Sequence, residues 1–148
     1  MTLLAPLSFI ILLAADTTAA NPCATGWSAW ERGDGRTALP LLEECMASVP
    51  MPRNVAVEIN NAIGAIRFGN RDYPGAVEAY TASLALQPAQ AEILTSRGDA
   101  HARQKAMDAA LADYNAALAL EPQNPRALFS RAGLYLETER VPLALADI

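Results

Sequence analysis

The chain is 148 residues long and mildly acidic, with 16 carboxylate side chains against 11 basic ones and a formal net charge of −5 at pH 7. It is 52% hydrophobic but only 6% aromatic, so alanine and leucine supply most of the apolar mass, a composition that favours helix. Because the basic residues are scattered among carboxylates, the sequence lacks the positive surface that binds a nucleic-acid backbone. We expect no nucleic-acid partner.

The first 20 residues resemble a secretory signal. Residues 3–13 form an uncharged, mostly apolar run that small residues follow. Cleavage after Ala20 would place Thr18 and Ala20 where a signal peptidase accepts small side chains, and cleavage after Ala19 is equally suitable. The run is shorter than the roughly 20 residues that cross a bilayer, although an uncleaved anchor and a buried helix are alternatives. We therefore expect residues 1–20 to be cleaved, the protein to be periplasmic or secreted, and no membrane association after cleavage.

The two cysteines are expected to form a disulfide, because an exported chain meets an oxidising compartment. A bridge between Cys23 and Cys45 closes a loop of about 20 residues, which in the chain-entropy model stabilises the fold by about 3 kcal/mol. The alternative is that Cys45 is a small buried helix residue, since the corresponding places later in the chain hold Ser83 and Ala117. Two cysteines and the single histidine, His101, predict no metal site.

The sequence repeats itself at an offset of 34 residues. Matching residues at this offset form the pairs Gly64 and Gly98, Ala76 and Ala110, Tyr80 and Tyr114, Leu84 and Leu118, and Pro88 and Pro122. A fainter copy at residues 31–50 matches the second half of the unit, and four extra residues, 53–56, separate it from the next copy. A fixed period of this length is typical of stacked repeat architectures.

Each full copy contains two helical stretches. In residues 91–104 and 108–120, apolar and small residues recur at three- and four-residue spacing, which predicts two antiparallel helices. Gly98 is small, and we expect it where the two helices approach closely. Pro122 cannot continue a helix, so we expect the second helix to end by Leu120.

The small residues, tyrosines and prolines at this period resemble the tetratricopeptide repeat (TPR). The resemblance implies an all-α fold, a right-handed α-α superhelix of stacked helical hairpins, because a lone hairpin cannot bury its apolar side. It divides the chain into a degenerate hairpin at 21–56, full repeats at 57–90 and 91–124, and a partial repeat at 125–148 that ends within its second helix. Polar residues stand where the family commonly has large apolar ones at Asn60, Arg67, Arg97 and His101.

In this family the first helix of each hairpin lines a concave wall that binds partners. The resemblance places eight predicted partner-binding residues on that wall: Asn61, Phe68, Thr95, Asp99, Arg103, Arg126, Phe129 and Leu136. The apolar members would anchor side chains of a peptide or helix, and the polar members would fix its direction. The alternative is that these residues belong to solvated helix faces.

The last predicted helix presents an apolar face with nothing stacked on it, formed by Val141, Leu143, Ala144, Leu145 and Ile148. Repeat arrays usually finish with a polar capping element. Either the array continues beyond this sequence, or this end meets a partner or pairs with a second copy as a homodimer.

The sequence predicts binding and no chemistry. His101 is the sole imidazole, and neither a Gly-rich phosphate loop nor a nucleophile with its base is recognisable, so we expect no enzyme and no cofactor. Some TPR proteins grip the tails of heat-shock chaperones with a set of lysines and asparagines, of which only Asn61 and Arg126 have counterparts here. We expect a scaffold for a protein or peptide partner. The alternatives are the front portion of a larger envelope or secretion-related protein and a self-associating module.

Overall fold

The computed structural model describes residues 21–48 and 50–148, which form helices and no strand. The predicted signal, residues 1–20, lies outside the described residues. In chain order the helices are α2 (Pro22–Glu31), α3 (Gly35–Ser48), α4 (Arg53–Gly69), α5 (Tyr73–Leu86), α6 (Ala91–Arg103), α7 (Met107–Leu120), α8 (Pro125–Glu137) and α9 (Val141–Ala146).

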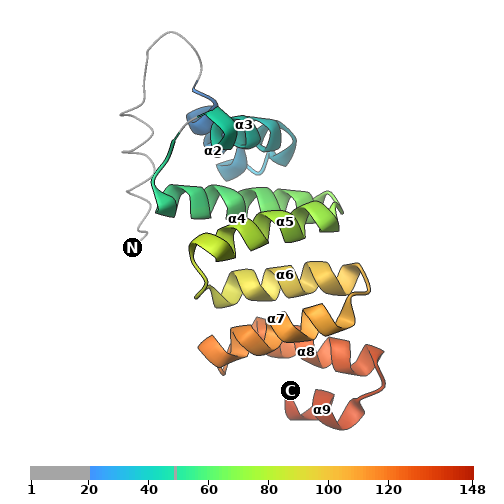
Figure 1. Ribbon diagram of the computed structural model, residues 1–148. Helices are drawn as coiled ribbons and strands as arrows, with labels where there is room; N and C mark the ends of the chain where they lie inside the picture. The colour runs from blue at the N-terminus through green and yellow to red at the C-terminus, as the bar shows by residue number, and fades with distance from the viewer. Residues whose placement is uncertain (1–20, 49) are drawn as a thin grey trace.

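The described helices pair into antiparallel hairpins that are stacked in chain order (Figure 1). The pairs are α2 with α3, α4 with α5, α6 with α7, and α8 with α9, and the second helix of each pair contacts the first helix of the next. Helix α6 also contacts both α4 and α8, so the first helices of the last three described hairpins form one continuous wall. The predicted all-α superhelix of stacked hairpins is confirmed.

Each hairpin turns through a residue in the left-handed region of backbone space. Arg71, Lys105 and Glu139 have φ angles of 65°, 62° and 60°, and Gly33 has 76° in the first hairpin. A left-handed residue after a helix lets the following amide return to a carbonyl of the last turn. The Ala106 amide does so by donating to the carbonyl of His101 at 3.0 Å. The three non-glycine residues recur at the repeat period, so the turn is part of the repeated unit.

The glycines of the repeat make room for a tyrosine ring. A Cβ atom at Gly64 would lie 2.5 Å from Cε1 of Tyr80, and one at Gly98 would lie 2.6 Å from Cε1 of Tyr114. Both rings come from the second helix of the same hairpin and are buried, with Tyr114 only 2% exposed. The prediction that Gly98 lies at the contact between the helices is confirmed, and the ring explains why a glycine is needed there.

Residues 53–56 form the first turn of α4. Val55 and Ala56 within this turn are buried, and the side-chain amide of Asn60 donates to the carbonyl of Ala56 at 2.8 Å. The four extra residues therefore lengthen a helix and extend its packed face. This also accounts for the polar residue at Asn60, whose amide is satisfied within its own helix.

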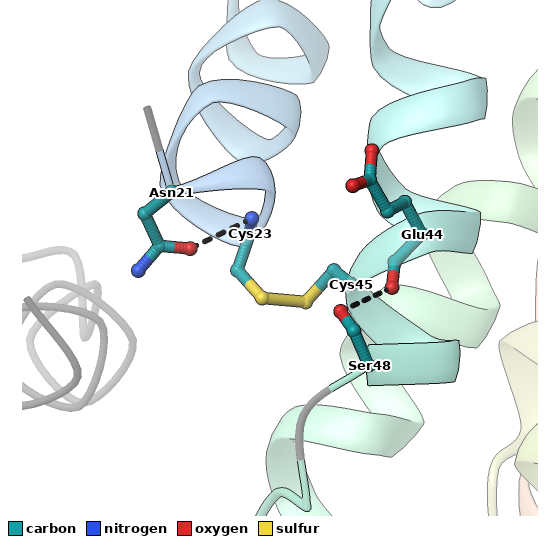
Figure 2. Close-up of a disulfide and its surroundings, with 5 residues drawn as sticks. All are labelled: Asn21, Cys23, Glu44, Cys45 and Ser48. Carbon is teal, nitrogen blue, oxygen red and sulfur yellow. Dashed lines mark hydrogen bonds between the residues drawn. A yellow bond between two sulfur atoms is a disulfide. The ribbon is translucent and has the colours of Figure 1, made fainter. Parts of the chain in front are cut away.

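A disulfide joins Cys23 of α2 to Cys45 of α3, with the two Cα atoms 4.9 Å apart (Figure 2). The side chain of Asn21 caps α2 beside the bridge by accepting from the amide of Cys23 at 2.9 Å. Cys45 is 1% exposed, and Ser83 and Ala117, which hold the same place in the next two hairpins, are fully buried. The bridge therefore occupies a packing position that all three hairpins share.

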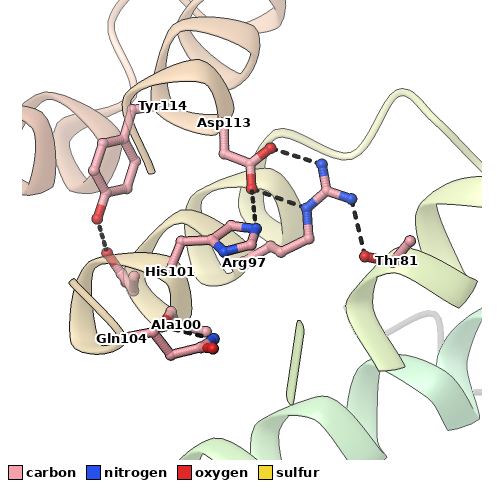
Figure 3. Close-up of polar contacts among 8 residues, drawn as sticks. Thr81, Arg97, Ala100, His101, Gln104, Asp113 and Tyr114 are labelled. Atoms are coloured by element: carbon pink, nitrogen blue, oxygen red, sulfur yellow. Dashed lines mark hydrogen bonds and ion pairs between the residues drawn. The ribbon is translucent and has the colours of Figure 1, made fainter. Parts of the chain in front are cut away.

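Two ion pairs occupy identical places in the third and fourth hairpins. Arg97 donates from Nε and Nη2 to the two carboxylate oxygens of Asp113 at 2.8 and 2.6 Å, and Arg131 contacts Asp147 in the same way at 2.7 and 2.6 Å. Figure 3 shows Arg97 of α6 reaching Asp113 of α7, with Nε2 of His101 3.9 Å from Oδ2 of Asp113, the oxygen that also accepts from Nε of Arg97. Arg97 and His101, two of the polar residues that depart from the family pattern, thus contact a carboxylate of their own hairpin.

Arginines also connect successive hairpins. Arg67 donates to Glu43 at 2.8 Å, Arg97 to Thr81 at 3.1 Å (Figure 3), and Arg131 to Asn115 at 2.7 Å. The three acceptors, Glu43, Thr81 and Asn115, hold the same place in the second helix of the preceding hairpin. Each described junction between hairpins therefore carries an arginine bond to this place, donated by the equivalent residues Arg97 and Arg131 and, from one turn further along the helix, by Arg67.

The short helix α9 leaves most of its apolar side chains in solvent. Leu143 is 49% exposed and Leu145 69%, whereas Ala144 is fully buried, and Ile148, beyond the end of the helix, is 86% exposed. The predicted apolar face is present, and its one buried member, Ala144, packs within the hairpin.

We predict that Gly98→Ala destabilises the protein by about 2 kcal/mol, because the new methyl group meets the buried ring of Tyr114. Gly133→Ala is the matched control, since nothing lies within 4 Å of a Cβ built at Gly133 in α8. It should stabilise by roughly 0.5–1 kcal/mol through helix propensity. Urea unfolding followed by far-ultraviolet circular dichroism measures both, and equal effects of the two changes would contradict the ring-on-glycine contact.

We predict that the Arg97–Asp113 pair can be replaced as a unit but not one partner at a time. Asp113 is buried, so Arg97→Ile should cost about 3 kcal/mol by leaving a carboxylate without its counter-charge. The second hairpin has Ile63 and Ala79 at the same two places. The double variant R97I/D113A should therefore unfold within about 1 kcal/mol of the unmodified protein.

The control for this cycle is the exposed pair of Lys105 and Glu137. Lys105→Ala should change the free energy of unfolding by no more than about 0.5 kcal/mol, because surface ion pairs contribute little. Additive effects of R97I and D113A in urea unfolding would show that the two side chains are not energetically coupled.

Candidate functional site

The wall formed by the first helices is hollowed at its N-terminal end. This aromatic hollow has a volume of about 470 Å³ and is lined by Trp27, Trp30, Glu58, Asn61, Ala62, Ala65, Phe68, Tyr80, Glu92, Ile93, Ser96 and Arg126. Its residues come from α2, α4, α5, α6 and α8, so it exists only when the hairpins are stacked.

A second hollow continues the wall towards the C-terminal end. This polar hollow has a volume of about 460 Å³ and is lined by Phe68, Asp99, Ala102, Arg103, Tyr114, Ser130, Gly133, Leu134 and Glu137. Phe68 lines both hollows. Its ring is held edge-on by Tyr73, with the ring centroids 5.4 Å apart, so a fixed aromatic side chain separates the two hollows.

Five of the eight predicted partner-binding residues line these hollows: Asn61, Phe68, Asp99, Arg103 and Arg126. Some residues of the wall occupy equivalent places in successive repeats. Glu58, Glu92 and Arg126 share one such place in successive hairpins, and all of them line the aromatic hollow. That these residues contact a partner stays a prediction.

Thr95 was assigned wrongly to the exposed wall. It is fully buried, and its hydroxyl donates to the carbonyl of Ala91 at 2.8 Å. The same place in the first hairpin holds Cys23, which is bonded to Cys45 in the second helix of that hairpin. Because its side chain is covered and bonded within its own helix, Thr95 cannot reach a bound molecule. Asn61, which holds the same place in the second hairpin, lines the aromatic hollow instead.

Phe129 and Leu136 are exposed, by 79% and 53%, but they line neither hollow. Phe129 has the same place in the repeat as Asn61, which lines the aromatic hollow, and Thr95, which is buried. The same place is therefore a wall position in the second hairpin and a buried position in the third, and in the fourth it leaves Phe129 exposed outside both hollows.

Sequence reasoning missed the two tryptophans of the aromatic hollow. Trp27 and Trp30 lie in α2 at the places that match Ala65 and Phe68 once the four extra residues, 53–56, are included in the offset. The first half of the first hairpin resembles the repeat too weakly for its wall positions to be assigned at an offset of 34. Applying the longer offset would have found both tryptophans.

Asp99 connects three elements across the polar hollow. It accepts from the hydroxyl of Tyr114 at 2.9 Å and from the guanidinium of Arg126 at 2.8 Å. Burial and the neighbouring Asp99 carboxylate raise the pKa of Tyr114, so the hydroxyl stays a neutral donor. Arg126 is about half exposed, at 49%, and it is held in place between the two hollows by Asp99.

The aromatic hollow contains acceptor side chains that are not paired with a donor. Burial raises the pKa of Glu58, and neither Glu58 nor Glu92 forms an ion pair with any residue that the structure describes. Asn61 donates to the side-chain oxygen of Gln90 at 3.1 Å, but its own Oδ1 atom is buried without a hydrogen-bond partner. Such a lining suits a ligand that brings hydrogen-bond donors.

The described residues contain no group of three or more His, Cys, Asp or Glu side chains that could hold a metal ion. Across the same part of the chain, no helix combines the length and the apolar character needed to span a bilayer. What the site offers is a long concave surface with aromatic, charged and amide side chains, an arrangement suited to holding an extended or helical peptide.

Solved structures with this fold include MamA, which has a TM-score of 0.74 and 18% sequence identity over 82% of this chain and 69% of MamA. YrrB, a TPR protein with an unusual peptide-binding site, has a TM-score of 0.74 and 16% identity over 85% of this chain and 64% of YrrB. The TPR2B domain of yeast Sti1, solved in complex with pHsp70, has a TM-score of 0.61 and 28% identity over 62% of this chain and 74% of that domain's chain.

No curated protein matches the chain in sequence. The family model described as tetratricopeptide repeat matches residues 61–125 and 108–148, more than half of the chain. The spacing of the hairpins, their ring-on-glycine contacts and the stacked wall agree with that match. The chain belongs to the tetratricopeptide repeat family.

Proposed function

We propose that the protein is a scaffold that binds a segment of a partner protein along the concave wall and catalyses no reaction. The observation that carries this proposal is the pair of adjoining hollows that meet at Phe68. Each is large enough for one or two side chains, and together they follow the wall over successive hairpins. A peptide lying across them would place neighbouring side chains in the two hollows and its backbone against the polar side chains between them.

The TPR2B domain of Sti1, which shares this fold and 28% of aligned residues, supports the proposal because it was solved with a bound partner, pHsp70. The chemistry of the wall differs from that of the chaperone-tail binders. Asn61 and Arg126 are the only counterparts of the lysines and asparagines that the family resemblance implies for such binders, and Ala65, Ser96 and Ser130 supply neither an amide nor a cation. We infer that the partner of this protein is of another kind.

The partner segment is expected to depend on Phe68 and not on Phe129. Phe68→Ala should weaken capture of the partner by at least ~10-fold, since a buried aromatic anchor at the centre of an interface carries much of the binding energy. Phe129→Ala is the matched control, because Phe129 is more exposed yet lines neither hollow.

The measurement is cross-linking in the cell followed by copurification, with circular dichroism to confirm equal helicity of the two variants. Capture that survives Phe68→Ala, or that is lost in Phe129→Ala, would place the binding surface elsewhere.

We also propose that the protein is exported and acts in the periplasm or outside the cell, with Cys23 and Cys45 oxidised. Support comes from the signal-like sequence of residues 1–20 and from the position of the two cysteines on facing helices. Thiols in the cytoplasm are kept reduced, so a disulfide between facing helices is typical of exported proteins.

We predict that the protein isolated from an exporting cell begins at Ala20 or Asn21 and resists alkylation until it is reduced. The bridge should stabilise it by about 3 kcal/mol, so Cys45→Ser should lower the free energy of unfolding by about that amount. Ser83→Ala, at the same place in the next hairpin, is the matched control and should cost no more than about 1 kcal/mol. Mass spectrometry and urea unfolding make the measurements, and a chain that starts at Met1 with two free thiols would contradict the proposal.

A further inference from the structure

Four aromatic side chains meet in the aromatic hollow. Trp27 and Trp30 come from α2, Phe68 from α4 and Tyr80 from α5. Both tryptophans are partly buried against the core of the first hairpin, which fixes their place on the wall. Aromatic faces carry negative electrostatic potential, so they attract a cation that lies over them.

The lining of this hollow carries more unpaired negative charge than unpaired positive charge. Glu58 and Glu92 have no ion-pair partner among the described residues, and the one cation in the lining, Arg126, donates to Asp99, which belongs to the polar hollow. Glu92 is exposed, whereas Glu58 is partly buried. The carboxylates are therefore free to meet a positive group, and the burial that raises the pKa of Glu58 is a desolvation cost that such a group would offset.

The hydrogen-bonding groups of this hollow also include an acceptor that has no donor. The Oδ1 atom of Asn61 is a buried acceptor without a partner, while the indole N–H of Trp27 is already bonded to Glu31 at 3.0 Å. A ligand with several N–H donors would satisfy acceptors that the protein leaves open. An anion would meet two carboxylates, and a purely aliphatic side chain would bury them without compensation.

We propose that the aromatic hollow binds a lysine or arginine side chain of the partner, so that the scaffold selects a cationic peptide segment. The aliphatic stem of that side chain would lie against Trp27, Trp30 and Phe68, and its charged end would lie between Glu58 and Glu92. This inference rests on the proposed function, because it names the chemistry of the segment that the concave wall holds.

The test is selection of random peptides displayed on phage by the immobilised full-length protein and by two variants. The unmodified protein should enrich peptides that contain lysine or arginine beside apolar residues. The variant E58Q/E92Q, which keeps the shape of both side chains and removes their charge, should lose this enrichment. Glu44→Gln is the control, since Glu44 is exposed on α3 and lines neither hollow.

A selected peptide is then titrated against the protein by tryptophan fluorescence. Trp27 and Trp30 are the two tryptophans of the chain, so their emission reports directly on this hollow. We expect E58Q/E92Q to bind at least ~10-fold more weakly, Glu44→Gln to bind as the unmodified protein does, and affinity to fall as salt is added. Replacing the cationic residue of the peptide by leucine should produce a loss similar to that of E58Q/E92Q.

Three outcomes separate this inference from the function on which it rests. Enrichment of acidic peptides, of peptides without a charge bias, or of cationic peptides that E58Q/E92Q binds equally well would overturn the cation site and leave the scaffold intact. Selection of no peptide at all, together with failure to capture a partner in the cell, would overturn both.

Discussion

The contact between a tyrosine ring and a glycine sets the geometry on which the rest of the molecule depends. In the second hairpin the Tyr80 ring lies over Gly64, and in the third the Tyr114 ring lies over Gly98. Each ring fixes how closely the two helices of its hairpin approach, and close packing leaves little freedom to adjust that distance. Because two successive hairpins use the same contact, they have the same shape and can stack in a regular way.

The hairpins are then joined by two kinds of contact, one apolar and one polar. Small apolar residues such as Ala76 and Ala110 fill the interior, while arginines connect each first helix to the second helix before it. The third hairpin has the buried pair Arg97 and Asp113 where the second has Ile63 and Ala79. The same backbone thus accepts either an apolar or an ionic pair, which is why polar residues at places that usually hold apolar ones leave the fold unchanged.

The concave wall differs from the junctions because its side chains follow the repeat less strictly. One place in the repeat holds Glu58, Glu92 and Arg126 in turn, and another holds Trp27, Ala65, Asp99 and Gly133. Nothing in the packing requires these differences, since these residues face the hollows. Variation on a regular framework gives the wall an aromatic, acidic end and a more polar end, and this asymmetry would give a bound segment one direction.

The sequence by itself determined the elements and the period. Pro88 and Pro122 fixed where the second helices end, and the matched glycines and tyrosines indicated which helices pair. It could not determine how far each first helix is rotated about its axis, because spacing along a helix says which residues share a face but not what covers that face. The tertiary structure decided that Thr95 is buried against its own hairpin, that Trp27 and Trp30 belong to the wall, and that Arg97 bonds to Asp113 and Thr81. These outcomes depend on contacts between residues distant in sequence, and only the stacking of the hairpins brings those residues together.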